Sequence, residues 1–169
     1  MNRIIFYILL SIFSFTWSYA QPSKPKFSHP HGLYNEPFFL TIECKDAQAT
    51  IYFTTDGKAP TVENACIYTQ PIRIEGTTVM RTMAMDESGT SKVNTATYIF
   101  LNDVLKQDNS PEEYPSEWGS YASRTGTAIA DYEMDPEMTA DEAFCQPLKK
   151  GFESIPIISV AMDPMHLFN

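Results

Sequence analysis

The sequence predicts an all-β sandwich with a partial α/β extension after it, and three observations support this. Between residues 38 and 100, short runs rich in β-branched and aromatic residues follow one another closely. The gaps between these runs contain Gly, Pro, Asp or Asn, which turn the chain. No helical period appears until well past residue 100. Strands at such regular spacing are typical of an immunoglobulin-like sandwich.

Six runs are the expected strands, and we place them at residues 38–44, 50–55, 66–69, 72–74, 77–85 and 93–100. In the second of them, Ile51 and Phe53 should point to one side of the sheet, and Tyr52 and Thr54 to the other. Successive side chains alternate across a strand. We therefore expect residues 21–100 to form one sandwich domain, within which Ile51 and Phe53 fill the interior.

The first 20 residues predict an export signal. Arg3 precedes an uncharged apolar run at residues 4–15, and the small residues Ser18 and Ala20 occupy the positions that a signal peptidase recognises. The apolar run is shorter than the roughly 20 residues that cross a bilayer. We expect cleavage after Ala20, no membrane span afterwards, and a periplasmic, cell-surface or extracellular location. An uncleaved signal anchor is the alternative.

Charge and cysteine content narrow the function classes. The chain of 169 residues carries a formal net charge of −9, with a sequence pI near 4.7. Nucleic acid is not expected as a partner, because phosphate binding needs a basic surface.

The three cysteines allow two interpretations. In an oxidising compartment Cys44 and Cys66 would form a disulfide and Cys145 would stay free, but small buried side chains are the plainer interpretation. The spacing leaves the disulfide state open, and isolated cysteines predict no zinc site.

The stretch IYFTTDGKAPT at residues 51–61 could be a site or a turn. Gly57 can take a positive φ, the Asp56 carboxylate can accept bonds from the next backbone N–H groups, and Pro60 fixes φ at the exit. A glycosidase would need a second carboxylate about 5–10 Å away in a cleft. Nothing in the sequence brings Glu63 or Asp86 into that place. We therefore predict a turn here and no catalytic residue.

This stretch, with IYTQPIRI at residues 67–74 and the run at residues 77–100, resembles the C-terminal β-sandwich of chitobiases and β-hexosaminidases. It is also similar to the sandwich attached to some α-fucosidases. The resemblance covers roughly residues 25–100 and implies a non-catalytic accessory of exported, mostly bacterial, carbohydrate-active or cell-surface proteins. The residues that form the expected structural signature are Ile51, Phe53, Thr54, Asp56, Gly57, Pro60, Tyr68, Pro71, Ile72 and Tyr98.

Residues 101–169 predict a loop-rich extension with a helix near residues 139–153 and a buried strand near residues 156–162. Thr139 is the expected N-cap, with acidic residues in the first turn, and Pro147 should kink or restart the helix. The segments at residues 130–136 and 154–168 resemble the lead-in of bacterial spore-coat protein H kinase-like proteins. That resemblance implies a following domain that transfers phosphate from ATP. The kinase-type residues of such a domain, namely a glycine-rich loop, a lysine and a metal-binding aspartate pair, cannot be assigned in this sequence. A fragment of a longer protein and a gene that ends early both stay open.

Three further groups of residues are candidate ligand sites. Tyr114, Trp118 and Tyr121 could stack on sugar rings, or could pack the extension against the sandwich. The alternating acids of residues 131–137 look like the start of a calcium loop, but Pro136 replaces the expected glycine, so a solvated acidic loop is the plainer interpretation. The two histidines of residues 29–31 lack a third ligand and predict a loop, not a metal site.

These observations predict an exported, non-catalytic accessory module that spaces or presents a neighbouring domain, with no cofactor and no metal. Its expected partners are a cell-surface glycan or a neighbouring catalytic domain. The alternatives are a carbohydrate-binding module and the truncated front part of a kinase-like phosphotransferase.

Overall fold

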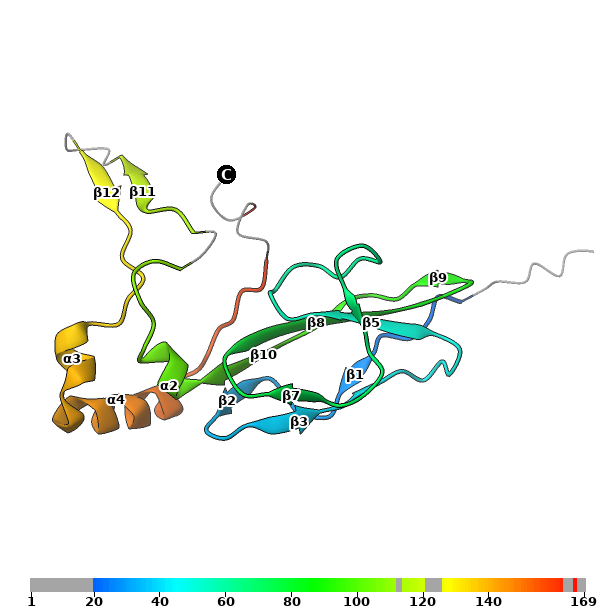
Figure 1. Ribbon diagram of the computed structural model, residues 1–169, viewed down its shortest axis with the longest axis horizontal. Coiled ribbons are helices and arrows are strands. Elements are labelled where there is room, and N and C mark those ends of the chain that lie inside the picture. Colours follow the sequence, from blue (N-terminus) through cyan, green and yellow to red (C-terminus); the bar gives the residue numbers. More distant parts are fainter. Residues whose placement is uncertain (1–19, 112–113, 121–125, 163–165, 167–169) are drawn as a thin grey trace, which may run out of the picture.

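A computed structural model describes residues 20–111, 114–120, 126–162 and 166 of the chain. The predicted export signal, apart from Ala20, and the candidate sugar-binding residue Tyr121 lie outside the described residues. The sandwich occupies one end of the molecule and the extension the other (Figure 1).

The larger layer is a six-stranded sheet in the order β2-β10-β8-β5-β6, with β9 paired to the end of β8. Its strands are β2 (Gly32–Tyr34), β5 (Thr50–Thr54), β6 (Cys66–Ile67), β8 (Thr78–Asp86), β9 (Gly89–Thr90) and β10 (Asn94–Phe100). The three central strands pair antiparallel, whereas β2 pairs parallel with β10. The long strands β8 and β10 coincide with the two longest runs in the predicted set.

The second layer consists of two short antiparallel pairs. In one, β1 (Lys26–Phe27) pairs with β4 (Ile42–Glu43), and in the other β3 (Phe38–Leu40) pairs with β7 (Ile72–Ile74). Side chains of β3 and β7 meet those of β8 and β10 between the layers. The predicted all-β sandwich is thereby confirmed.

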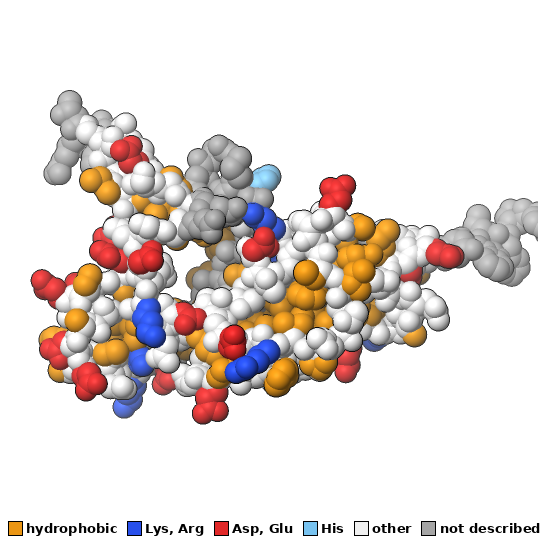
Figure 2. Space-filling view, in the orientation of Figure 1, with side chains coloured by type: hydrophobic (Ala, Val, Ile, Leu, Met, Phe, Trp, Pro, Cys, Tyr) orange, Lys and Arg blue, Asp and Glu red, His pale blue; other side chains and the backbone are white. Residues whose placement is uncertain are grey.

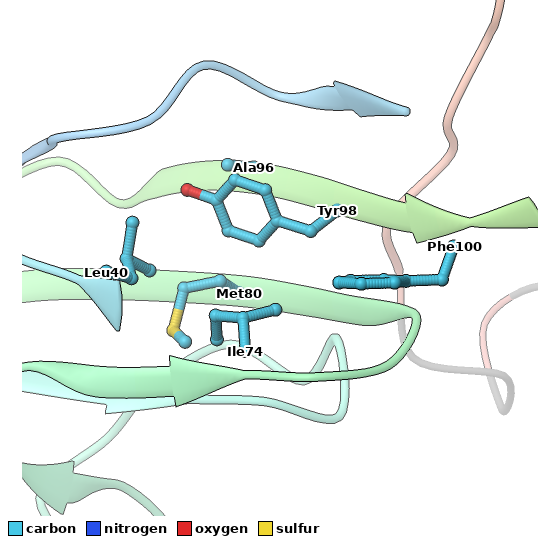
Figure 3. Packing of buried hydrophobic residues seen from close by; sticks show 6 residues of the cluster. All are labelled: Leu40, Ile74, Met80, Ala96, Tyr98 and Phe100. Carbon is cyan, nitrogen blue, oxygen red and sulfur yellow. The ribbon is translucent and has the colours of Figure 1, made fainter. Parts of the chain in front are cut away.

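The core lies between these layers, and β10 contributes three alternate residues to it (Figure 3). Its buried members are Leu40, Ile74, Met80, Ala96, Tyr98 and Phe100. Leu40, Met80 and Tyr98 are fully inaccessible to solvent, and Phe53 packs against the same cluster. Burying a large apolar side chain stabilises the fold by about 1.5–3 kcal/mol, so this cluster is the main source of the sandwich's stability.

Strands β1 and β2 were missed by the sequence prediction, and their ring contacts explain why they form. The ring of Tyr98 is met edge-on by those of Phe27, Tyr34 and Phe38, with ring centroids 5.2–6.4 Å apart. The Tyr98 hydroxyl donates a hydrogen bond to the backbone oxygen of His29 at 3.2 Å. Burial raises the pKa of the Tyr98 phenol above its usual range. Residues distant in sequence therefore fix this segment onto β10.

The extension begins with the short helix α2 (Leu101–Val104) and continues through a hairpin of β11 (Glu117–Ser120) and β12 (Thr127–Ile129). Two helices follow, α3 (Pro136–Ala140) and α4 (Glu142–Ser154). The predicted N-cap Thr139 was wrong: it lies within α3, and Asp141 caps α4 by accepting a hydrogen bond from the Ala143 backbone N–H at 2.8 Å. Pro147 lies inside α4, which continues past it without a restart.

The buried strand predicted at residues 156–162 was wrong. The segment runs from the end of α4 as irregular chain, beside the six-stranded sheet (Figure 1). Most of its apolar side chains are exposed, and among the described residues its backbone makes no backbone hydrogen bond. The apolar run predicted a strand, but the described residues provide no strand for it to pair with.

Candidate functional site

The Asp56–Gly57 corner connects β5 to the loop that leads to β6. The Lys58 backbone N–H donates to Asp56 Oδ1 at 3.0 Å, and the Lys58 ammonium lies 4.0 Å from Asp56 Oδ2. Gly57 has a φ of 80°, and its N–H donates to the backbone oxygen of Val79 at 3.2 Å. This is the geometry that a turn requires: the aspartate accepts a hydrogen bond two residues on, and glycine takes a left-handed conformation.

Other polar groups near the corner also hold the turn together. Thr54 Oγ1 donates to the backbone oxygen of Lys58 at 2.6 Å, and Arg81 Nη1 donates to the backbone oxygen of Gly57 at 3.0 Å.

Asp86, considered above as a second carboxylate, lies in a different turn. It accepts hydrogen bonds from the backbone N–H and the hydroxyl of Ser88. Both carboxylates therefore have structural partners.

The remaining signature residues lie in or beside the sandwich. Phe53 and Ile72 pack against the core cluster, and the Tyr68 N–H donates to the backbone oxygen of Ile51 at 2.8 Å. Pro60 is buried below the corner, whereas Pro71 is exposed. Phe53 faces the interior as expected, but Ile51 is only half-buried and lies outside the core cluster.

Tyr114 and Trp118 come together in the extension because both contact Tyr132. The Tyr132 ring stands nearly perpendicular to each of them, with centroid distances of 5.5 Å to Tyr114 and 5.7 Å to Trp118. Tyr114 is 44% exposed and Trp118 is 55% exposed. We call Tyr114, Trp118 and Tyr132 the aromatic group. Its exposed rings can contact the apolar face of a sugar.

Tyr132 is held in place by hydrogen bonds at both ends. Its hydroxyl accepts from Trp118 Nε1 at 3.0 Å and donates to the backbone oxygen of Pro115 at 2.9 Å. Its backbone N–H donates to Asn109 Oδ1 at 2.8 Å, and its backbone oxygen accepts from Gln107 Nε2 at 2.5 Å. Tyr132 was not predicted as a site residue, because it lies in an acidic stretch that resembles the start of a calcium loop. The spacing of 14 residues from Trp118 gives no local signal.

A groove of about 580 Å³ separates the six-stranded sheet from the segment at residues 157–161. Its lining contains no Asp, Glu, Lys or Arg: His31, Gly32, Thr95, Ala96, Thr97 and Ile99 form one side, and Ile157, Ser159 and Ala161 the other. The hydroxyls of Thr97 and Ser159 lie 2.5 Å apart and join the two sides. This hydrogen bond is the polar contact that holds the segment beside β10.

The candidate metal and cysteine sites do not assemble in the described part of the chain. There, no group of three His, Cys, Asp or Glu side chains is placed to hold a metal ion. Asp135, within the acidic stretch at residues 131–137, caps α3 by accepting from the Glu137 N–H at 2.9 Å. His29 stacks on Phe38 with ring centroids 4.4 Å apart. All three cysteines are free and none is buried, which differs from the expected buried side chains; Cys66 is exposed on β6.

The sandwich is similar to a known protein family. Residues 29–97 match the family described as the chitobiase/beta-hexosaminidase C-terminal domain. The match runs from β2 into β10 and includes the Asp56–Gly57 corner, so the sandwich is similar to the carbohydrate-associated modules of this family. No curated protein and no solved structure matches the chain. The match ends at residue 97, so the resemblance of the extension to spore-coat protein H kinase-like proteins stays a prediction.

Proposed function

We propose that the chain is an exported, non-catalytic accessory module that spaces or presents a neighbouring domain at a cell surface or outside the cell. The family match over residues 29–97 carries this proposal. The acidic group at the centre of the matched stretch, Asp56, holds a turn, and its hydrogen bond to the Lys58 N–H supports a structural role. Across the described residues, no helix is long and apolar enough to cross a membrane.

Export is tested by expressing the full chain in a bacterial host and sequencing the N-terminus of the protein recovered outside the cytoplasm. We expect the recovered protein to begin at Gln21, because Ser18 and Ala20 are the small residues before the cleavage point. Changing Ala20→Arg should block processing. Recovery of the unprocessed chain in the cytoplasm only would contradict the export proposal.

The non-catalytic role is tested with chromogenic N-acetylglucosaminides and the purified protein. We expect no turnover above a buffer blank, and the same result for Asp56→Asn, which keeps the hydrogen-bond acceptor of the turn. Turnover by the parent protein that disappears in a fully folded Asp56→Asn variant would reverse the assignment.

Carbohydrate binding is a second candidate function, favoured by the aromatic group. Trp118 is the only tryptophan after residue 20 and is 55% exposed. If a sugar stacks on it, chito-oligosaccharides should shift its fluorescence in a saturable way. Tyr132→Phe removes the acceptor for Trp118 Nε1 and should weaken the response, whereas Tyr52→Phe on the sheet should leave it unchanged. A flat titration with chitin, cellulose and xylan fragments would leave only the accessory role.

A further inference from the structure

Residues 155–162 form an extended apolar segment whose two sides differ. Ile157, Ser159 and Ala161 line the groove against the six-stranded sheet, as described above. Between them, Ile158 is 89% exposed and Val160 is 72% exposed. The alternation of inward and outward side chains is the period of a β-strand. We call the side that carries Ile158, Val160 and Met162 the outer side of the segment.

The backbone of this segment lacks the partners that a strand normally has. Ile155, the residue after α4, has φ −108° and ψ 149°, which is the extended conformation. In the part of the chain that the structure describes, residues 156–162 make no backbone hydrogen bond, and the Ser159 hydroxyl provides the one side-chain hydrogen bond, to Thr97. An extended run of unpaired N–H and C=O groups is a template for another strand.

The charge around the segment indicates what kind of strand fits. Residues 126–154, which lead into it, carry seven acidic side chains and two lysines. Figure 2 shows several acidic side chains, with basic ones among them, over the helical end of the molecule. Residues 154–162 themselves carry no charge. A second copy of the chain, with its net charge of −9, would bring like charge to the contact. A basic partner is favoured instead.

We propose that the outer side of residues 155–162 is a docking surface for an extended strand of another polypeptide, apolar along its length and basic at its ends. The partner strand supplies hydrogen bonds to the unpaired backbone and covers Ile158 and Val160. The basic end that falls beside Ile155 lies against the acidic helical end, whichever way the partner strand runs. This role does not depend on export or on sugar binding, so a negative result for either of these would not contradict it.

The test uses the full chain and a fluorescein-labelled synthetic strand in which valine alternates with threonine, with a lysine pair at each end. Fluorescence anisotropy should show saturable binding that weakens as salt is added. The same strand ending in glutamate pairs should bind about tenfold more weakly or worse, because it meets like charge. A strand N-methylated along both edges has no backbone donors left for pairing and should not bind.

Variants of the chain locate the contact. The double change Ile158→Ser with Val160→Ser removes two exposed apolar side chains and should weaken binding by about tenfold or more. The matched control, Val62→Ser with Ile67→Ser, removes two apolar side chains that are each 56% exposed on the sandwich. It should bind like the parent. Because all four side chains are exposed, circular dichroism should show that both variants keep the fold.

Several results would overturn the proposal. One is absence of binding by the lysine-ended strand, and another is equal loss of binding in both variants. Equal binding of the N-methylated strand would mean that backbone pairing plays no part. Self-association of the parent chain in sedimentation, abolished by Ile158→Ser with Val160→Ser, would make a second copy the occupant and refute the basic partner.

Discussion

Gly57→Ala is expected to destabilise the sandwich, because alanine does not share glycine's freedom at positive φ. Gly57 has a φ of 80°. A left-handed conformation costs a residue with a Cβ about 1–2 kcal/mol. The added Cβ would lie 3.4 Å from Val79 Cγ1, which is ordinary van der Waals contact, so steric overlap adds little. Alanine also restricts the unfolded chain, which offsets part of this cost.

These contributions leave a loss of about 1 kcal/mol in the free energy of unfolding. For a chain of this size, that corresponds to a fall of about 3 °C in the thermal midpoint. Urea unfolding followed by circular dichroism measures the first quantity, and a thermal scan measures the second. The two backbone bonds at Gly57, from its N–H to Val79 and from Arg81 to its oxygen, should persist in the variant.

A matched control comes from Gly151, which lies inside α4, where an added Cβ would have no heavy atom within 4 Å outside the helix's own backbone. The same change there, Gly151→Ala, should stabilise the helix by about 0.5–1 kcal/mol, because alanine is the better helix former. Opposite signs at the two glycines would isolate backbone conformation as the cause. If Gly57→Ala is neutral or stabilising in a folded protein, the turn at Asp56–Gly57 does not constrain the chain in this way.

Three further changes probe the core and two titrating groups. Met80→Ala empties a fully buried position and should lower the free energy of unfolding by about 2–5 kcal/mol in urea titrations. Burial raises the pKa of Tyr98 above its usual value of 10.0. The neutral phenol therefore stabilises the fold below pH 10, and this stabilisation is lost as the pH rises further. The free energy of unfolding should fall less at alkaline pH in Tyr98→Phe than in the parent. The Ser23 hydroxyl and N–H, both 2.6 Å from Asp46 Oδ2, lower the pKa of Asp46 below 3.8. Their stabilising effect is present above that pH and lost as the pH falls through the lowered pKa, and Ser23→Ala should move the carboxyl pKa upward in an NMR titration.

The corner at residues 56–57 was predictable because its determinants are local. An aspartate followed by glycine fixes a turn through the aspartate carboxylate and a backbone N–H two residues on, all within one short stretch. The strand before the corner is also determined locally, since the β-branched and aromatic residues of β5 lie together in the sequence. Strands β1 and β2 depend on contacts with residues that are distant in the sequence. They are two and three residues long and depend on ring contacts with Tyr98, which lies far along the chain.

The aromatic group illustrates the same limit at the candidate site. Tyr114 and Trp118 are close in sequence, and their aromatic character was enough to single them out. The residue that brings them together is Tyr132, whose position depends on the hydrogen bonds that it accepts from Gln107 and Trp118 and on the one that it donates to Pro115. The spacing of residues in the sequence does not reveal contacts of this kind. Sequence alone therefore predicts the exposed rings of Tyr114 and Trp118 but not Tyr132, which orients them.

Residues 156–162 show a third relation between pattern and structure. The apolar run that predicted a buried strand has the alternation of a strand in the structure, because inward residues line the groove and outward residues face solvent. A strand, however, is defined by pairing, and pairing depends on a second segment that a local pattern cannot supply. Exposed Ile158 and Val160 on an unpaired extended backbone are costly to keep in water. Exposed apolar side chains on an unpaired backbone fit a segment that pairs with a strand of another polypeptide. The described residues contain no such strand, so the predicted strand does not form among them.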